Sequence, residues 1–191
     1  MWRLDLAFAD IISTTTDPML GAIRMAWWRE RLEELDQGRP APAEPRLQAV
    51  ARELLPRGVV GKDLSKLEDA WLPLLQPFPW GAHAVEGLKL RGRVLFETGA
   101  GLLGGQDSKA EVAGEFWSLF DGARHCSDRQ SCELLLVSAR AALANLPKKA
   151  VREMRPLTVL AALAAADLGE AGGFARVAAA LRHRITGRFP R

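Results

Sequence analysis

Apolar residues recur at intervals of three to five positions along most of this chain, the spacing expected of helices that bury one face. Eight segments carry this pattern, and we predict a helix in each. They cover residues 17–37, 46–55, 63–75, 82–103, 108–124, 128–145, 148–168 and 174–185. No run of alternating apolar and polar residues is long enough to predict a sheet. The pattern therefore predicts an all-α protein whose helices are joined by short loops.

The first of these helices has clear signals at both ends. Asp17 is a good N-cap, and Pro18 fits the first turn, where the N–H that it lacks would have no partner. Gly38 ends the helix, and a proline-rich connection follows over residues 38–45. The apolar positions predict one buried face, made up of Leu20, Ile23, Trp27, Leu32 and Leu35.

Composition places the chain among compact globular proteins. Its 191 residues are 48% hydrophobic and 26% charged, which suffices for one core, so we expect a single domain over residues 1–191. The two cysteines favour neither a disulfide nor a metal site and fit a reducing compartment. No apolar run reaches the roughly 18–20 residues of a membrane span. We therefore expect a cytoplasmic protein that is at most peripheral to a membrane.

Basic residues gather at the carboxyl end, although the whole chain carries a net charge of only +3. Residues 174–191 hold five arginines and one histidine and no acidic residue. Such a segment is suited to phosphates or to an anionic membrane surface. A solvated helix without a partner explains the same pattern, and the sequence leaves both interpretations open.

The helix that begins at Pro18 carries the most recognisable motif in the chain. Residues 18–29 read Pro-Met-Leu-Gly-Ala-Ile-Arg-Met-Ala-Trp-Trp-Arg. This run resembles, almost without interruption, the Trp-Trp helix of bacterial proteins in the squalene/phytoene synthase family. Residues 88–105 resemble a family helix that ends in small residues, and residues 156–168 and 181–188 resemble the family's closing pair of helices. The resemblance extends over most of the chain and is most specific at the Trp-Trp helix.

The resemblance implies both a fold and a chemistry. It implies a single helical bundle of the isoprenoid synthase type, here shortened at its N-terminus, around one mostly apolar cavity. Enzymes of the family join two prenyl diphosphates head to head. In them, two acidic motifs with Asp residues four apart on one helix face hold the Mg²⁺ that neutralises the diphosphate leaving group.

Neither acidic motif is present in this sequence. Upstream of the Trp-Trp helix stand only Asp5 and Asp10, which lie about 140° apart around a helix and share no face. At the second motif Arg124 matches the family arginine, but His125 and Arg129 take the places of the two aspartates. An arginine at such a position would repel Mg²⁺. We therefore expect no metal site and no catalytic residue.

These observations favour a family member that has lost its catalytic motifs and acts by binding. It is similar in this respect to the branch that includes a respiratory complex I assembly factor. The resemblance implies a protein partner or an apolar isoprenoid or lipid ligand, and no cofactor. Two alternatives stay open. One is an active Mg²⁺-dependent prenyl-diphosphate transferase that takes its first motif from upstream sequence or from another chain, and the other is a structural subunit paired with a longer homologue.

Five residues are candidates for lining the family cavity. They are Asp10, Arg24, Trp27, Trp28 and Arg124. Trp27 and Trp28 point about 100° apart on a helix, so we expect one in the core and the other at a cavity, at a partner surface or in a second packed layer. Arg24 would meet a diphosphate in an active enzyme and would otherwise form an ion pair.

Two further patterns favour no function of their own. Residues 99–104 match a dinucleotide-binding pattern literally, but they end a predicted helix and follow no strand. The six tryptophans do not alternate with a basic stripe, and we expect no nucleic-acid partner.

Overall fold

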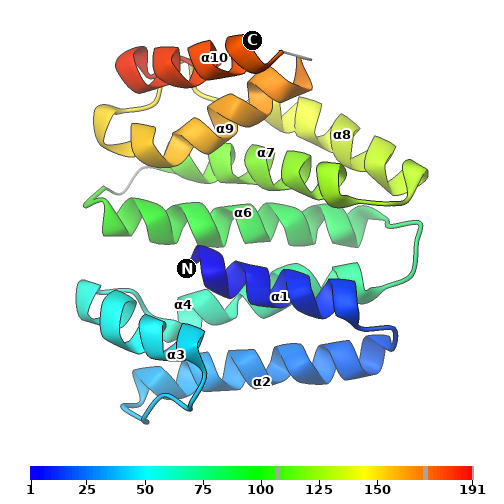
Figure 1. Cartoon of the computed structure of the whole chain (residues 1–191), viewed down its shortest axis with the longest axis vertical. Helices are drawn as coiled ribbons and strands as arrows, with labels where there is room; N and C mark the ends of the chain where they lie inside the picture. Colours follow the sequence, from blue (N-terminus) through cyan, green and yellow to red (C-terminus); the bar gives the residue numbers. More distant parts are fainter. Residues whose placement is uncertain (106–107, 170–171, 191) are drawn as a thin grey trace.

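The computed structural model describes residues 1–105, 108–169 and 172–190, and it is built of helices (Figure 1). Within these ranges there is no strand, only one isolated bridge at which Ala150 N–H donates to Gly187 O at 2.9 Å. The all-α prediction is thus confirmed. The helices are stacked from α2 at one end to α10 at the other, with α6 across the middle (Figure 1).

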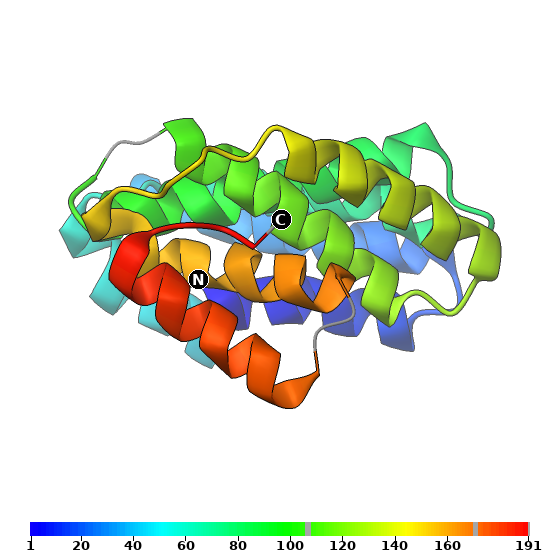
Figure 2. The same cartoon turned by 90° about the horizontal axis from the view of Figure 1, so that it is seen from above.

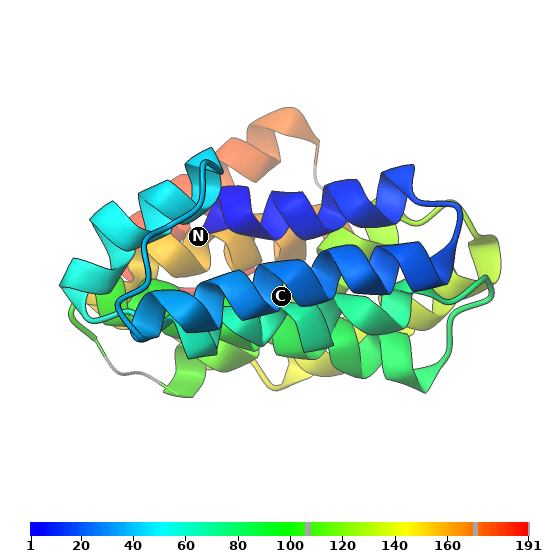
Figure 3. The same ribbon diagram turned by 90° about the horizontal axis from the view of Figure 1, so that it is seen from below.

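Helix α1 (Trp2–Thr14) occupies a segment for which we predicted no helix. No side chain caps its N-terminus, so local signals in the sequence are weak. It is held by packing instead, since Leu4, Phe8 and Ile11 share a face and are almost completely buried. Figure 3 shows α1 side by side with α2 (Pro18–Asp36).

Helix α2 begins where the sequence predicts. The Asp17 carboxylate accepts a hydrogen bond from Met19 N–H at 2.8 Å, as expected of an N-cap. The predicted buried face is wrong in its first half, because Leu20, Ile23 and Trp27 are exposed. The buried residues are Gly21, Met25, Trp28, Leu32 and Leu35.

Close packing explains which side of α2 is buried. A Cβ atom at Gly21 would lie only 2.4 Å from a methyl carbon of Leu75, so the glycine lets the two segments approach. Turning Gly21 inward brings Met25 and Trp28 with it. The apolar residues of the neighbouring stripe are left on the surface.

Residues 45–75 form short helical pieces rather than two regular helices. The first predicted helix consists of α3 (Pro45–Ala49), a π-helical turn (Val50–Leu54) and a 3₁₀ turn (Leu55–Arg57). The second consists of α4 (Gly61–Ser65), α5 (Leu67–Trp71) and a 3₁₀ turn (Leu72–Leu75). Pro73 lacks the N–H that a continuing α-helix would use. The predicted buried side of this segment is confirmed for Leu64, Leu67, Trp71 and Leu74.

The centre of the molecule is formed by α6 (Ala82–Leu102) and α7 (Ser108–His125). Their backbones meet at two glycines, since a Cβ atom at Gly92 would lie 2.1 Å from Gly114 O. Only glycine at both positions permits this distance. Helix α6 stops at Gly104, whose φ of 78° is a left-handed conformation.

Three helices complete the stack: α8 (Arg129–Ala144), α9 (Arg155–Leu168) and α10 (Gly173–Thr186). Helix α9 begins later than predicted because Arg152–Met154 forms a separate 3₁₀ turn and Pro156 occupies the first turn of α9. Figure 2 shows α10 lying against α9 on the outside of the stack. Among the described helices, none has the combination of length and apolar character that crossing a bilayer requires.

Candidate functional site

A pocket of about 530 Å³ opens between α1, the segment around α5, α6 and α7. Its wall is predominantly apolar, and we refer to it as the tryptophan pocket because four indole side chains contribute to it. They are Trp2, Trp71, Trp80 and Trp117. Volumes of about 300–1,000 Å³ are typical of small-molecule sites. Four of the six tryptophans of the chain therefore surround a space of ligand size.

The floor of the pocket is a buried ion pair between α1 and α6. Arg91 Nη2 donates to Asp5 Oδ2 at 2.8 Å, and Arg91 Nε donates to Asp5 Oδ1 at 2.9 Å. Arg91 Nη1 donates to Asp121 Oδ2, also at 2.8 Å. The side chains of Arg91 and Asp5 are only 6% and 3% exposed. Burial alone would lower the pKa of Arg91, but the two carboxylates outweigh it and the pKa lies above its ordinary value.

Two indole rings enclose the guanidinium of Arg91. Its Cζ atom lies 4.8 Å from the ring centroid of Trp71 and 4.8 Å from that of Trp117. Trp71 also donates from Nε1 to Asp5 Oδ1 at 2.9 Å. Cation–π contacts are strongest where the charge is desolvated, as it is here. The four side chains therefore hold one another in place and fix the floor of the pocket.

Exposed side chains of α1 and α7 form the rim. Leu6 and Ser13 come from α1, and His125 comes from the last residue of α7. His125 Nδ1 lies 2.8 Å from the backbone oxygen of Asp121. A carbonyl oxygen only accepts, so this nitrogen carries the proton and the ring is held at the mouth of the pocket.

Asp5 and Asp10 reach the tryptophan pocket at different depths. They point to different sides of α1, in agreement with the sequence argument, since Asp5 is buried at the floor whereas the Asp10 side chain is 63% exposed at the rim. Asp10 Oδ2 pairs with Arg46 Nη2 at 3.3 Å. Of the five cavity candidates from the sequence, Asp10 is the one that lines this pocket.

The two arginine candidates lie elsewhere. Arg24 is exposed on α2, and its Nη1 atom donates to Thr15 Oγ1 at 2.8 Å. Arg124 faces α9, where Nη1 pairs with Asp167 Oδ2 at 3.2 Å. Both side chains thus connect neighbouring segments of the fold.

The two tryptophan candidates also lie outside the tryptophan pocket. Trp28 is buried, and its ring centroid lies 6.2 Å from that of Phe8. Trp27 is 39% exposed and packs edge-on against Trp28 at 5.3 Å. One ring is therefore in the core and the other is on the surface of α2.

The residues that replace the second acidic motif do not share a helix. His125 ends α7 and Arg129 begins α8, so the four-residue spacing does not bring them onto one face. The Arg129 side chain is 93% exposed and pairs with Glu133 at 3.0 Å. Only His125 belongs to the tryptophan pocket.

The carboxylates of the pocket do not fit the Mg²⁺ that the family resemblance implies. Both oxygens of Asp5 accept hydrogen bonds from Arg91, and Asp121 Oδ2 accepts a third. In the part of the chain that the structure describes, no three or more His, Cys, Asp or Glu side chains are arranged to hold a metal ion. The cation bound between these carboxylates is a guanidinium.

Sequence reasoning missed Arg91 and its aromatic neighbours, although one signal was available. Arg91 stands three positions after Leu88 and four before Leu95, so it lies on an apolar helix face. A charge on a buried face requires a buried partner of opposite charge. Asp5, which stands three positions before the core residue Phe8 of α1, gives the same signal.

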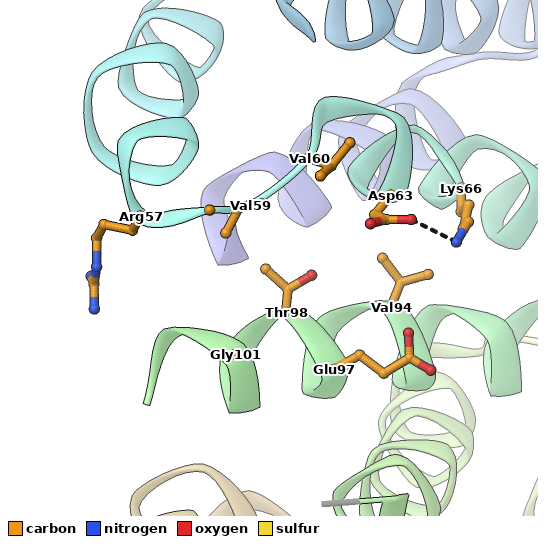
Figure 4. A pocket seen from close by; sticks show the side chains of 10 residues that line it. Arg57, Val59, Val60, Asp63, Lys66, Val94, Glu97, Thr98 and Gly101 are labelled. Carbon is orange, nitrogen blue, oxygen red and sulfur yellow. Dashed lines mark hydrogen bonds and ion pairs between the residues drawn. The ribbon is translucent and has the colours of Figure 1, made fainter. Parts of the chain in front are cut away.

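A second hollow, of about 280 Å³, lies between residues 57–60, α4 and α6 (Figure 4). In it Lys66 Nζ donates to Asp63 Oδ1 at 2.7 Å, and Glu97 lies across from this pair on α6 (Figure 4). Burial raises the pKa of Glu97, and the charge of Glu111 adds to the rise. The described residues that line this hollow include no aromatic side chain, so we place the candidate site at the tryptophan pocket.

The tryptophan pocket combines an apolar wall with a floor whose charges are already paired. Such a space can remove an apolar molecule from water, while Asp10, Ser13 and His125 at the rim can meet its polar end. In comparisons with known proteins, no protein-family model, curated protein or solved structure matches the chain.

Proposed function

We propose that this chain binds an apolar ligand of the prenyl or lipid class in the tryptophan pocket, and that it acts by binding rather than by catalysis. The observation that carries the proposal is the wall of four tryptophans above a floor of paired charges. Each methylene group moved from water into such a wall contributes about 0.8 kcal/mol. A hydrocarbon chain is therefore the ligand that gains most from this pocket.

The charges around the pocket argue against a free diphosphate as the ligand. Asp5, Asp10 and Asp121 carry three negative charges, and Arg91 is the one arginine among the lining residues. Arg91 also has its donors engaged by Asp5 and Asp121. A diphosphate would meet repulsion without a free guanidinium to bind it. An uncharged or positively charged head group suits the rim better.

The family resemblance supports the same class of ligand. We propose that the chain is a member of the squalene/phytoene synthase family that has lost its metal chemistry. The all-helical build agrees with this proposal, as does the meeting of acidic residues from two distant segments in one apolar pocket. In this arrangement Arg91 neutralises the carboxylates of Asp5 and Asp121.

Titration calorimetry with farnesol and with farnesyl diphosphate, each with and without Mg²⁺, tests the proposal. Farnesol should bind with an affinity that Mg²⁺ does not change, and farnesyl diphosphate should bind more weakly. If Mg²⁺ strengthens the binding of farnesyl diphosphate about tenfold or more, the active-transferase alternative is correct instead. If neither compound binds, the tryptophan pocket is not a prenyl site.

Substitutions at the pocket link binding to this location. Ala9→Leu fills part of the wall and Leu6→Gln makes the rim polar, so both should weaken farnesol binding about fivefold or more. Val137 on α8 is a matched control, because it is 62% exposed against 55% for Leu6 and does not line the pocket. Val137→Gln should bind farnesol like the parent protein.

One observation favours the alternative of a structural subunit. Helix α2 exposes a strip of apolar side chains, the kind of surface that a paired subunit covers. The strip consists of Met19, Leu20, Ile23 and Trp27. Sedimentation velocity of the chain, alone and mixed with a longer homologue, distinguishes the alternatives: association that Ile23→Ser abolishes would support the structural subunit, whereas a chain that stays monomeric and binds farnesol supports the ligand-binding function alone.

A further inference from the structure

A stripe of large apolar side chains runs along the outer side of α10. It consists of Phe174, Val177, Leu181 and Ile185, spaced three or four residues apart. Phe174 is 89% exposed and Ile185 is 74% exposed. Side chains of this kind are seldom left in water as a continuous row, so the stripe calls for a partner.

The opposite side of α10 is firmly attached to the rest of the fold. His183 is completely buried, its Nε2 atom lies 2.9 Å from Thr158 Oγ1 of α9, and Nδ1 donates to Arg188 O at 3.1 Å. Arg176 adds an ion pair with Asp167 at 3.2 Å. At about 100° per residue, His183 points opposite to Phe174. The inner face of the helix is thus occupied, and the apolar stripe faces away from the molecule.

Two arginines border the stripe. With Phe174 as the reference direction, Arg182 and Arg184 lie about 80° to either side. Both are exposed, and neither has an acidic partner within the described residues. No acidic residue occurs anywhere in positions 173–191, although Arg191 lies outside the described residues. The stripe therefore has one positive charge at each edge, near the C-terminal end of α10.

We propose that α10 binds to the surface of an anionic lipid bilayer, lying in the plane of the interface with Phe174, Val177, Leu181 and Ile185 among the acyl chains. Arginines at both edges can extend toward the phosphate groups while their methylene groups stay in the apolar layer. This arrangement of one apolar stripe between basic edges is typical of interfacial helices. The fold presents the helix already formed, so binding costs no folding of the segment.

Charge complementarity favours a bilayer over a protein partner. A protein surface that covered the stripe would need acidic groups along both edges of a single helix, whereas an anionic bilayer supplies them everywhere. The proposal concerns the surface of α10 and does not depend on the ligand of the tryptophan pocket.

Vesicle flotation with the full chain tests this proposal. The parent protein should bind vesicles of phosphatidylcholine and phosphatidylglycerol in equal parts, bind vesicles of phosphatidylcholine alone much more weakly, and be released by salt. The double variant Phe174→Ser, Ile185→Ser should lose about tenfold or more of its affinity. In the double variant Arg182→Gln, Arg184→Gln, the affinity for the anionic vesicles should fall roughly fivefold for each arginine removed.

Matched controls distinguish binding through α10 from nonspecific adsorption of the protein to vesicles. Met19→Ser with Ile23→Ser removes two apolar side chains that are 72% and 60% exposed on α2, and Arg52→Gln with Arg129→Gln removes the same charge elsewhere. Both controls should bind vesicles like the parent. The proposal is overturned if the parent does not bind anionic vesicles, or if the controls lose as much as the α10 variants. It is also overturned if Phe174→Ser with Ile185→Ser splits an oligomer but leaves vesicle binding unchanged.

Discussion

Arg91 and Asp5 are 86 positions apart in the sequence and meet as a two-pronged ion pair in which both partners are buried. Taking two such charges out of water costs several kcal/mol for each ion, and their mutual attraction offsets this desolvation cost only when the geometry is good. Here the pair has that geometry, with a second carboxylate from Asp121 and an indole ring on either side. The pair fixes α1 to α6 and forms the floor of the tryptophan pocket.

Asp5→Asn should lower the free energy of unfolding by about 3–5 kcal/mol, because it leaves the buried guanidinium with one of its two carboxylates. Urea denaturation followed by circular dichroism measures the change. Asp10→Asn is the control, since Asp10 is 63% exposed and its loss should cost less than about 0.5 kcal/mol. Equal effects of the two substitutions would contradict the assignment of Asp5 to a buried pair.

A double variant tests the pair itself. Arg91→Met together with Asp5→Leu removes both charges from the interior and should be more stable than either single variant. The remaining carboxylate, Asp121, is 27% exposed and can be solvated from the pocket. If the losses in free energy of unfolding of the two single variants simply add in the double variant, the double-mutant cycle would show that the residues do not interact.

Gly92→Ala should destabilise the protein by about 1–3 kcal/mol or more, because the new methyl group would lie 2.1 Å from Gly114 O and would force α6 and α7 apart. Gly101→Ala in the same helix is the control, since a Cβ atom there meets nothing within 4 Å. That control should stabilise the helix by about 0.5–1 kcal/mol. Thermal denaturation measures both effects: the melting temperature should fall in Gly92→Ala and rise in Gly101→Ala if α6 and α7 meet at Gly92 and Gly114.

The attachment of α10 should weaken in mild acid. Burial lowers the pKa of His183, and the charge of Arg155 lowers it further, so the folded protein holds this ring neutral. The unfolded chain takes up the proton first, and the stability that the neutral ring contributes above the ordinary pKa of about 6.5 is lost as the pH falls below it. Thr158 Oγ1 donates its proton to Met154 O at 2.9 Å, and His183 Nε2 lies 2.9 Å from the same hydroxyl oxygen.

Hydrogen exchange of α10 amides at about pH 7.5 and about pH 5.5, on either side of the ordinary histidine pKa, measures this effect. Exchange should accelerate at the lower pH after correction for the intrinsic rate. His183→Gln should remove most of that pH dependence, whereas His83→Gln at an exposed position should keep it. Acceleration that persists in His183→Gln would assign the effect to another group.

Glu68→Gln should raise the stability near neutral pH. Burial raises the pKa of Glu68, and the nearby charge of Arg29 at 3.1 Å offsets this only in part. An acid whose pKa is raised by folding contributes stability below its unfolded pKa, and that contribution is lost as the pH rises. The difference between variant and parent in chemical denaturation should therefore be largest near pH 7 and shrink toward about pH 4. Asp69→Asn at an exposed neighbouring position should show no such trend.

The sequence predicted the helices of this fold better than it predicted their contacts. Caps and stops such as Asp17 and Gly104 act within a few residues, so a local pattern contains them. Helix α1 was missed because it has no side-chain cap and is held by distant residues. The buried side of α2 was misassigned in its first half because two apolar stripes compete there, and the one that contains Gly21 packs against Leu75.

The candidate site was harder to predict for the same reason. Asp5 and Arg91 each stand on an apolar helix face, but their pairing depends on how α1 packs against α6. The search for family motifs pointed to positions near Trp28 and Arg124, which the fold directs to the core and to α9. A charged residue on an apolar helix face was the local signal that could have led to the tryptophan pocket.

A backbone contact as close as that between Gly92 and Gly114 leaves α6 and α7 no room to separate without losing their packing. The two helices therefore move as one body, and the wall that they give to the tryptophan pocket keeps its shape. The Asp5–Arg91 pair fixes α1 to the same body, so the exposed side chains at the rim, Leu6, Ser13 and His125, are the part of the pocket that is free to rearrange. The residence time of a bound molecule is then set by these rim side chains, and substitutions there should alter the rates of entry and exit while the enclosing helices stay unchanged.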